Sequence, residues 1–569
     1  MGKRLWRQEP LPHTAVRFES GLLAERRRVN RRATIPVVYE RLRETGRIAA
    51  LGLKRKPGQP FWDSDVAKWV EAAGLSLATH PDGALRMTLH RVVSRIVSAQ
   101  QADGYLNTWF TTVDPKGRWK DLTGAHELYS AGHLMEAAVA HYRATGNRRF
   151  IDAMCRYADY IGSVFGRGRG KLRGYPGHQE IELALVKLFR ATGRRRYLNL
   201  AKYFIDERGT RPNYFRRECE RRGVDPSVHG DFSSHQAHAP VREQREAVGH
   251  AVRAMYMYCG MADVAAETGD RELLAACRRL WNSAVGRKMY ITGGVGAVGW
   301  GEAFGRDYEL PNASAYCETC AAIGLVFFAH RMLQIEADSR YADTMERALY
   351  NGVLSGLSRD GRKFFYVNPL ASDGRHHRQD FFRVCCCPTN IVRLLAGLGS
   401  YVYSTAPGAV YVHLYAAGEA RCELAGQNLT LRQRTDYPWD GKVRIEVGVR
   451  EPTTFALMLR VPEWCRKHET AVNGRRLRAP VTQGYAKIDR AWRDGDVVEL
   501  SMDMPVERIV SLPAVAENAG RVALQRGPIV FCLEQCDHRA GVRSIVLPDA
   551  AKLSARFDAK SPGGCVVIE

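Results

Sequence analysis

A repeat of paired helices is the feature of this sequence that most restricts its fold. Between about residues 34 and 405, apolar residues recur at helical spacing, and each such stretch is followed by a short turn and a second amphipathic stretch. The turns are ATGNRRF at 144–150, ATGRRRY at 191–197, ETGDREL at 267–273 and EADSRYA at 336–342. Helical hairpins repeated over this length predict either a closed toroid of helix pairs or an open, superhelical scaffold.

After about residue 405 the apolar period changes from helical to alternating. Segments such as GKVRIEVGV and TTFALMLRVPEW are rich in β-branched residues and are bounded by turn residues, as is typical of antiparallel sandwich strands. We therefore predict an α+β multidomain chain with a helical domain over 1–405, a β-sandwich domain over 406–510 and a further β domain over 511–569. Because the chain ends on GGCVVIE, which has the pattern of a strand interior, we expect the last domain to be truncated.

Composition narrows the classes of function. A net charge of +23 would suit a polyanionic partner, but the basic residues are spread in short runs and the sequence contains no recognisable nucleic-acid-binding motif. The 14 cysteines lack the spacing of a disulfide framework, and the sequence shows no secretory signal and no apolar run long enough to span a membrane. We expect a soluble, cytoplasmic protein with reduced cysteines and with neither nucleic acid nor a membrane as partner.

Two polar clusters stand apart from the helical background. The first, YITGGVGAVGWGEAFGRDYELPNASAYCETCAAIGLVFF over 290–328, combines glycines with carboxylates and cysteines. It lacks the lysine and hydroxyl residue of a phosphate-binding loop, so its glycines more simply allow backbone and a carboxylate to reach a pocket. The second cluster is VCCCPTN at 384–390. Pro388 and the apolar stripe after it place these cysteines at a helix N-terminus, where thiolate is favoured over thiol.

Thiolates are zinc ligands, and the two clusters together offer three sulfurs and a carboxylate. Cys320, Cys386 and Cys387 with Glu318 could therefore hold a zinc ion, although the spacing is not that of a zinc finger. Buried free cysteines in an apolar core are the alternative. Residues two apart on a helix point to different sides, so joint ligation by Glu318 and Cys320 predicts a helix that begins near Cys320.

Histidines give a third signal. His126, His133, His178 and His250 lie at or near expected helix starts. A lone histidine of this kind is ordinarily a structural residue, but in a toroid the helix starts collect at one rim and can line a pocket. The aromatic and acidic side chains of FWDSDVAKW and DGYLNTWF could hold a sugar there, or could serve only in packing and turns.

A set of motifs in a fixed order covers essentially the whole chain. In order they are FWDSDVAKWVEAA, DGYLNTWF, HELYSAGHLMEAAVA, GHQEIELALVKL, VGHAVRAMYMYCGMADVA, GEAF, DYELPN, YCETCAAIGLVFF, FFYVNPL and CCPTN. This set resembles glycoside hydrolase family 127, the β-L-arabinofuranosidase family, and the block from GEAF to CCPTN is the most specific part. The resemblance implies an (α/α)6 barrel that carries the active site, followed by β-sandwich domains.

The resemblance also implies roles for individual residues. Glu302 of GEAF matches the general acid/base of the family, and Cys386 matches the nucleophile of a retaining mechanism. The implied cofactor is Zn2+, and its matching ligands are Glu318, Cys320, Cys386 and Cys387. The residues that match sugar contacts are His126, His178, His250 and Tyr366.

Two departures from the family pattern bear on the pocket. Val298, Gly299 and Trp300 precede the Gly-Glu pair where many relatives carry polar or histidine residues, which is expected to alter the leaving-group side. PTN replaces the more usual Pro-Pro-Asn at a helix start.

The sequence thus predicts a zinc-dependent, retaining glycoside hydrolase that releases terminal β-L-arabinofuranose or a closely related sugar. We expect a glycoside or oligosaccharide as substrate and a homodimer as the candidate assembly. A carbohydrate isomerase or lyase on the same toroid is one alternative. A non-catalytic helical binding protein with a structural zinc is the other.

Overall fold

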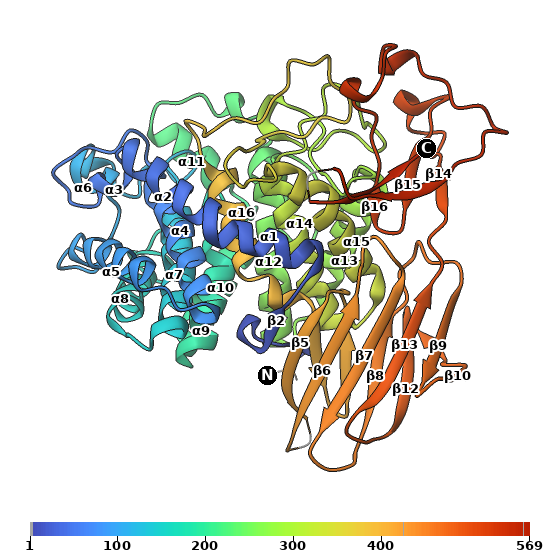
Figure 1. Cartoon of the computed structure of the whole chain (residues 1–569). Helices are drawn as coiled ribbons and strands as arrows, with labels where there is room; N and C mark the ends of the chain where they lie inside the picture. Colours follow the sequence, from blue (N-terminus) through green and yellow to red (C-terminus); the bar gives the residue numbers. More distant parts are fainter. Residues whose placement is uncertain (1–3, 425, 562) are drawn as a thin grey trace.

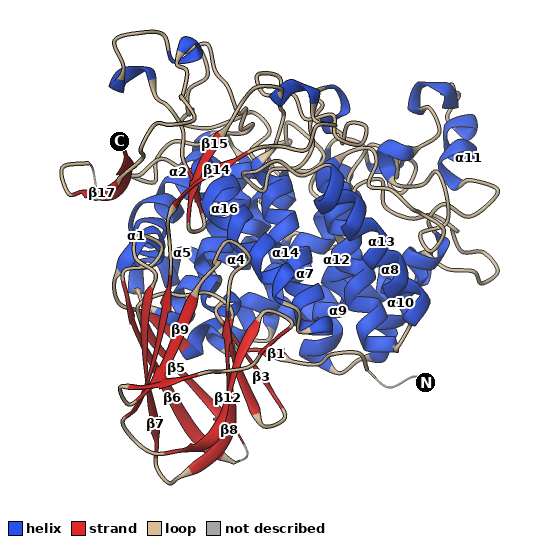
Figure 2. Cartoon of the chain, turned by 90° about the vertical axis from the view of Figure 1, so that its right-hand side faces the viewer, coloured by secondary structure: helices blue, strands red, loops and turns tan. Residues whose placement is uncertain are grey.

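A computed structural model describes residues 4–424, 426–561 and 563–569. It shows a helical part followed in the chain by β-sheets, which lie to one side of the helices (Figure 1). Coloured by secondary structure, the helices and the large sheets form separate layers (Figure 2). The multidomain α+β class predicted from the sequence is confirmed.

An inner ring of six helices forms the centre of the described helical part. Each of these helices packs against the next, and the last packs against the first. The inner helices are α4 (Trp62–Thr79), α7 (Glu127–Thr145), α9 (Ile181–Thr192), α12 (Ala251–Thr268), α14 (Thr319–Glu336) and α16 (Cys386–Ala396). They are buried over most of their surface, which explains why alanine and glycine replace polar residues on faces that a surface helix would expose. At Gly132 a Cβ would lie only 2.7 Å from Glu180 Cγ, so glycine allows the close approach of α7 to the start of α9.

An outer layer of helices covers this ring and completes the (α/α)6 barrel. Its members alternate with the inner helices along the chain, so the inner helices run in one direction and their N-termini collect at one rim. The first outer helix is α1 (Gly21–Val29), which continues through a π-helical segment at Asn30–Thr34 into α2 (Ile35–Glu44). The other outer helices are α5 (Gly83–Ser98), α8 (Arg149–Val164), α10 (Arg195–Glu207), α13 (Arg271–Arg287) and α15 (Ser339–Arg347). Shorter helices lie in the connections, namely α3 (Arg47–Ala50), α6 (Trp109–Thr112) and α11 (Tyr214–Arg221).

Two sheets form the β-sandwich. The first runs in the order β1 (Glu9–Pro10), β3 (Tyr403–Ala406), β4 (Ala409–Val412), β8 (Thr453–Arg460), β12 (Tyr485–Trp492) and β11 (Val481–Thr482). The second runs in the order β10 (Arg475–Leu477), β9 (His468–Val472), β13 (Asp496–Met502), β7 (Lys442–Val449), β6 (Gln427–Thr435), β5 (Gly418–Leu424) and β2 (Val16–Phe18). The alternating pattern read from the sequence has its physical basis here, because Val443, Ile445 and Val447 of β7 all point into the core.

The N-terminal segment belongs to the sandwich as well as to the helical part. β1 pairs with β3 and β2 pairs with β5, both antiparallel, so residues that the sequence placed in the helical domain extend both sheets. These strands are two and three residues long, too short to give an alternating pattern.

Small sheets follow the sandwich. One contains β14 (Val506–Ile509), β15 (Ala523–Arg526) and β16 (Ile529–Val530), and the other contains β17 (Ala555–Asp558) and β18 (Cys565–Ile568). The first small sheet thus begins before residue 511, where the sequence placed the start of the last domain. In the described ranges, no helix is both long and apolar enough to cross a bilayer.

Candidate active site

Two inner helices begin with the cysteines that the sequence singled out. Helix α14 starts at Thr319, and Glu318 before it has the non-helical angles φ −58° and ψ 136°. The predicted helix start near Cys320 is therefore confirmed, and it is this break that lets Glu318 and Cys320 point the same way. Helix α16 starts at Cys386, directly after Cys385, so the expected position of the triple cysteine at a helix N-terminus is also confirmed.

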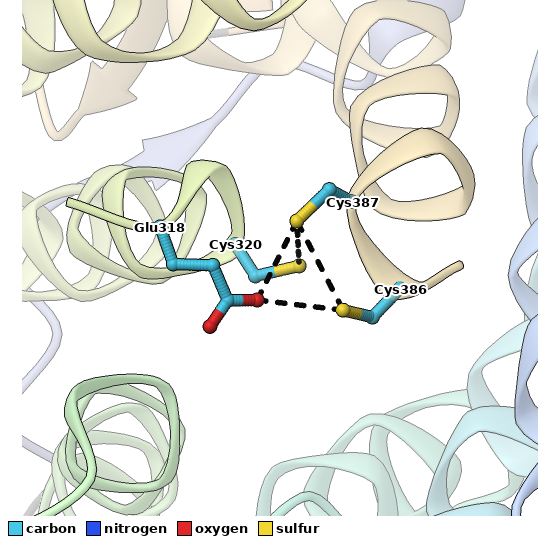
Figure 3. Close-up of side chains that lie close together, drawn as sticks. All are labelled: Glu318, Cys320, Cys386 and Cys387. Atoms are coloured by element: carbon cyan, nitrogen blue, oxygen red, sulfur yellow. Dashed lines mark hydrogen bonds between the residues drawn. The ribbon is translucent and has the colours of Figure 1, made fainter. Parts of the chain in front are cut away.

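Four side chains from these helix starts converge (Figure 3). The Sγ atom of Cys387 lies 3.5 Å from Cys320 Sγ and 3.9 Å from Cys386 Sγ. The Oε1 atom of Glu318 lies 3.4 Å from Cys386 Sγ and 3.5 Å from Cys387 Sγ. One ligand atom from each of the four residues lies within 4.8 Å of all the others.

These separations fit a tetrahedral zinc ion. Zn–S bonds of about 2.3 Å place two sulfurs of a tetrahedron about 3.8 Å apart, and a Zn–O bond of about 2.0 Å places oxygen about 3.5 Å from each sulfur. The observed S–S and O–S separations, 3.5 to 3.9 Å and 3.4 to 3.5 Å, agree with both values. The Oε2 atom of Glu318 is buried and has no hydrogen-bond partner among the described residues. The donor set therefore fits zinc, whereas thiols alone are poor donors to a buried carboxylate.

The groups of the cluster change one another's pKa values. Hydrogen bonding to Cys320, followed by burial, raises the pKa of Cys386 well above that of an ordinary thiol. Burial, followed by the charge of Cys386, raises the pKa of Glu318 as well. Against the effect of burial, hydrogen bonds from Cys386 and Cys387 lower the pKa of Cys320 to about 7. Without a cation, Cys386 and Glu318 would thus hold their protons at neutral pH.

Glu302 lies in a tight turn next to the histidines. Its backbone has a left-handed φ of 53°, a conformation that costs free energy in a non-glycine residue and often marks functional sites. Tyr316 Oη donates to Glu302 Oε1 at 2.9 Å, and His250 Nε2 lies 2.9 Å from Glu302 Oε2. Although burial raises the pKa of Glu302, these two contacts lower it to about 2.

The three histidines predicted to hold a sugar form a row at the rim. The rings of His126 and His178 are 5.5 Å apart, and those of His178 and His250 are also 5.5 Å apart. Burial, followed by the charge of Arg253, lowers the pKa of His126 to about 3 and that of His178 well below its usual value. Burial also lowers the pKa of His250. The three histidines are therefore neutral at pH 7, and a neutral imidazole can both donate to and accept from a hydroxyl group.

Tyr366 connects this row to the cysteines. Its Oη lies 3.1 Å from Cys386 Sγ, and its ring is 6.4 Å from that of Tyr316, which donates to Glu302. The structure thus brings every site residue predicted from the sequence into one connected group at the N-terminal ends of the inner helices. Which residue performs which role stays a prediction.

Sequence reasoning missed several residues at this site. Tyr316 was not distinguished from a packing residue, although it lies two residues before Glu318. Lys68 is fully buried on α4 and donates to Tyr129 Oη at 2.8 Å, and the Tyr129 ring lies 4.3 Å from that of His178. A lysine within an otherwise apolar helical stretch was the signal that could have identified it.

A buried ionic network joins α16 to the neighbouring inner helices. Arg393 on α16 lies 3.0 Å from a carboxylate oxygen of Glu71 on α4 and 2.6 Å from one of Glu136 on α7. Lys187 on α9 lies 2.9 Å from both of these glutamates. Because α16 carries Cys386 and Cys387, this network also positions the sulfur cluster.

Comparison with known proteins identifies the family. Residues 15–400 match a family model described as the GH127 catalytic domain of beta-L-arabinofuranosidase, 409–504 match the GH127 middle domain and 506–559 match the family 127 C-terminal domain. The chain belongs to glycoside hydrolase family 127. It is therefore a glycoside hydrolase, as the resemblance of its motifs predicted.

Individual members of family 127 match over almost the full chain. A non-reducing end beta-L-arabinofuranosidase of Bifidobacterium longum subsp. longum is 38% identical over 545 residues, which are 90% of this chain and 82% of the relative. The crystal structure of a GH127 beta-L-arabinofuranosidase from Geobacillus stearothermophilus T6 has a TM-score of 0.95 at 48% identity, and the match covers 97% of this chain and 92% of that one. A GH127 beta-arabinofuranosidase has a TM-score of 0.93 at 40% identity, covering 99% of this chain and 91% of that chain.

Proposed function

We propose that this chain is a retaining, zinc-dependent glycoside hydrolase that releases β-L-arabinofuranose, or a closely related sugar, from the non-reducing end of a glycoside. The names of its family 127 relatives support this sugar. The observation that carries the proposal is the convergence of Glu318, Cys320, Cys386 and Cys387 at the separations of a tetrahedral zinc site. Glu302 is linked to this cluster through the neighbouring rings of Tyr316 and Tyr366.

Cys386 is the proposed nucleophile because it differs from its neighbours in access. Cys385 and Cys387 are fully buried, whereas Cys386 is partly exposed and its sulfur lies 3.1 Å from Tyr366 Oη. When bound, zinc would keep the Cys386 sulfur as thiolate at neutral pH, which the metal-free surroundings oppose. Cys387 and Cys320 would then serve as ligands only.

Glu302 acts as the proposed proton donor and then as the base. In the first step the Cys386 sulfur attacks the anomeric carbon, the bond to the leaving oxygen breaks, and Glu302 gives its proton to that oxygen. In the second step Glu302 takes a proton from water, which displaces sulfur and returns the sugar with its original anomeric configuration. The neutral histidines would hold the sugar through its hydroxyl groups.

Glu302 must gain a proton before the first step, and its partners indicate how. In the free protein, contacts with His250 and Tyr316 keep Glu302 ionised. When substrate binds, a sugar hydroxyl would form a hydrogen bond with His250 in place of the one between His250 and Glu302. The loss of this contact would raise the pKa of Glu302.

One set of variants tests the proposal. We expect wild type to hydrolyse an aryl β-L-arabinofuranoside and to lose zinc and activity together when treated with a chelator. Cys386→Ser should lower kcat by about a thousandfold or more. Glu302→Gln should cost about a hundredfold to ten-thousandfold with a poor leaving group, and less with an activated aryl group.

The matched control is Cys385→Ala, at a buried residue adjacent to the nucleophile. It should retain zinc and activity because Cys385 is not one of the four converging residues. Full activity of Cys386→Ser or of a verified metal-free enzyme would contradict the mechanism. A protein that binds the sugar without turnover would instead be the non-catalytic alternative.

A further inference from the structure

One large aromatic side chain lies exposed beside the proposed acid. Trp300 has 90% of its surface exposed, which is unusual for so large an apolar residue. It lies in the turn 299–302, which also carries Glu302. The indole lies only two positions before Glu302 in the chain.

The turn that carries Trp300 is held firmly at its base. Val298 and Ala303 exchange backbone hydrogen bonds of 3.0 and 2.9 Å across it, and Phe304 N donates to Gly249 O at 2.9 Å, next to His250. At its tip, a Cβ added to Gly301 would meet no atom within 4 Å. The indole ring is therefore exposed to solvent, while backbone hydrogen bonds hold the ends of the turn that carries it.

We propose that Trp300 forms a leaving-group subsite, where its indole face stacks on the sugar ring that departs in the reaction. This inference rests on the proposed function, because Glu302 can protonate the glycosidic oxygen only if the leaving group extends past the turn that carries Glu302. The face of an indole is electron-rich and attracts the partly positive C–H hydrogens of a sugar ring. Neutral leaving groups as large as a pyranose or furanose ring are the class that fits.

Two substrates isolate this contact. Methyl β-L-arabinofuranoside has a leaving group too small to stack on the indole, whereas a β-L-arabinofuranosyl disaccharide has a sugar ring in this position. We expect Trp300→Ala to lower kcat/KM for the disaccharide about three- to tenfold more than for the methyl glycoside. Trp300→Phe keeps an aromatic face, so its additional loss of kcat/KM for the disaccharide should be smaller than that of Trp300→Ala.

Transfer to acceptors gives a second readout. A retaining enzyme can pass its bound sugar to an acceptor other than water, so an added monosaccharide should compete with water through the same subsite. Trp300→Ala should lower the yield of transfer to the monosaccharide relative to transfer to methanol. The control is Met87→Ala on α5, another exposed apolar side chain, which should change neither ratio.

The outcomes separate this inference from the proposed function. If wild type hydrolyses neither substrate, the proposed function fails. If wild type hydrolyses both substrates, the effect of Trp300→Ala on kcat/KM decides. An equal loss for both substrates would mean that Trp300 only supports Glu302, and no loss for either would mean that the indole binds no leaving group. Both results contradict the subsite and leave the proposed function intact. Trp300→Ala could also convert a wild-type dimer to a monomer without changing kcat/KM for the disaccharide relative to the methyl glycoside. That result would assign the indole to a contact between subunits and would also contradict the subsite.

Discussion

The charge on Glu302 is controlled by two neighbours, and one of them can be removed without loss of a sugar contact. Tyr316→Phe deletes the 2.9 Å hydrogen bond to Glu302 Oε1 and leaves His250 in place. Because this bond stabilises the ionised carboxylate, its loss should raise the pKa of Glu302 above about 2. In the dependence of kcat/KM on pH, the pKa assigned to Glu302 should therefore move to a higher value. The substrate for this measurement must have a leaving group that needs protonation.

The same variant should change the acid stability of the protein. The pKa of Glu302 in the folded protein, about 2, lies below its ordinary value of 4.5. Its ionised form therefore stabilises the fold above pH 4.5, and this contribution is lost as pH falls toward 2. Between pH 4.5 and 2, the free energy of unfolding should therefore fall less for Tyr316→Phe than for wild type. Tyr290→Phe removes a tyrosine that donates to Pro311 O instead, and should leave both profiles unchanged; an equal shift in this control would show that Tyr316 acts only through packing.

At the residue scale, the sequence identified the residues that we propose as catalytic groups and zinc ligands, but not the side chains that surround them. Glu302, Cys320 and Cys386 could be found because each occurs in a specific motif. The role of Lys68 and the pairing of His250 with Glu302 depend on contacts between segments more than 50 residues apart, and the contact of Tyr316 with Glu302 depends on the turns between them. A periodicity or a spacing carries no information about such contacts.

At the scale of elements, the start of α14 is joined to the loop that carries Tyr366. Asn368 Nδ2 donates to Cys317 O at 2.9 Å and to Thr319 Oγ1 at 3.0 Å, and Thr319 N donates to Tyr366 O at 2.9 Å. Asn368→Ala should lower the free energy of unfolding by about 1–3 kcal/mol. It should also raise KM, because Tyr366 is released from its position against Cys386.

Asn351→Ala is the matched control for this loop. Asn351 Nδ2 also donates two hydrogen bonds, to Arg347 O and Pro528 O, both at 2.9 Å, but it holds β16 and not the pocket. We expect a comparable loss of stability from chemical denaturation without a change in KM. If both variants raised KM equally, general loosening of the fold would explain the effect and the specific role of Asn368 would be wrong.

The elements themselves were predictable to different degrees. A helix beginning near Cys320 followed from the requirement that Glu318 and Cys320 share a ligand site, and the start of α16 followed from Pro388. The strands β1 and β2 could not be found, because residues 9–18 gain their regular structure only by pairing with β3 and β5.

At the scale of the whole molecule, a buried arginine joins the barrel to the sandwich. Arg460 on β8 is fully buried, lies 2.6 Å from Asp343 Oδ1 on α15, and also pairs with Glu346 on that helix. Arg460→Ala leaves these carboxylates buried without their cation, so the free energy of unfolding should fall by about 3–5 kcal/mol. The zinc content of the folded variant should be unchanged, as measured by metal analysis at low temperature.

The control for this joint is an exposed arginine of the same sandwich. Arg444 forms a pair of 3.3 Å with Glu499, and both side chains are about half exposed at 51% and 46%. Arg444→Ala should change stability by about 0–1 kcal/mol. A similarly small loss for Arg460→Ala would show that the joint does not depend on this ion pair.

The division into helical and β parts was visible in the change of apolar period near residue 405. The closure of the ring was not, because it requires α16 to pack against α4 across more than 300 residues of sequence. The identity of the family supplied that expectation, and the contacts between α16 and α4 now account for it.

The proposed mechanism requires a covalent bond between the Cys386 sulfur and the sugar. Glu302→Gln provides the means to trap this bond, since an activated aryl β-L-arabinofuranoside needs no acid to react but the product needs a base to be released. After rapid quenching, peptide mass spectrometry should find one pentosyl group on the peptide that contains Cys386. A pentosyl group on a carboxylate, or turnover that inverts the anomeric configuration without any adduct, would contradict the account.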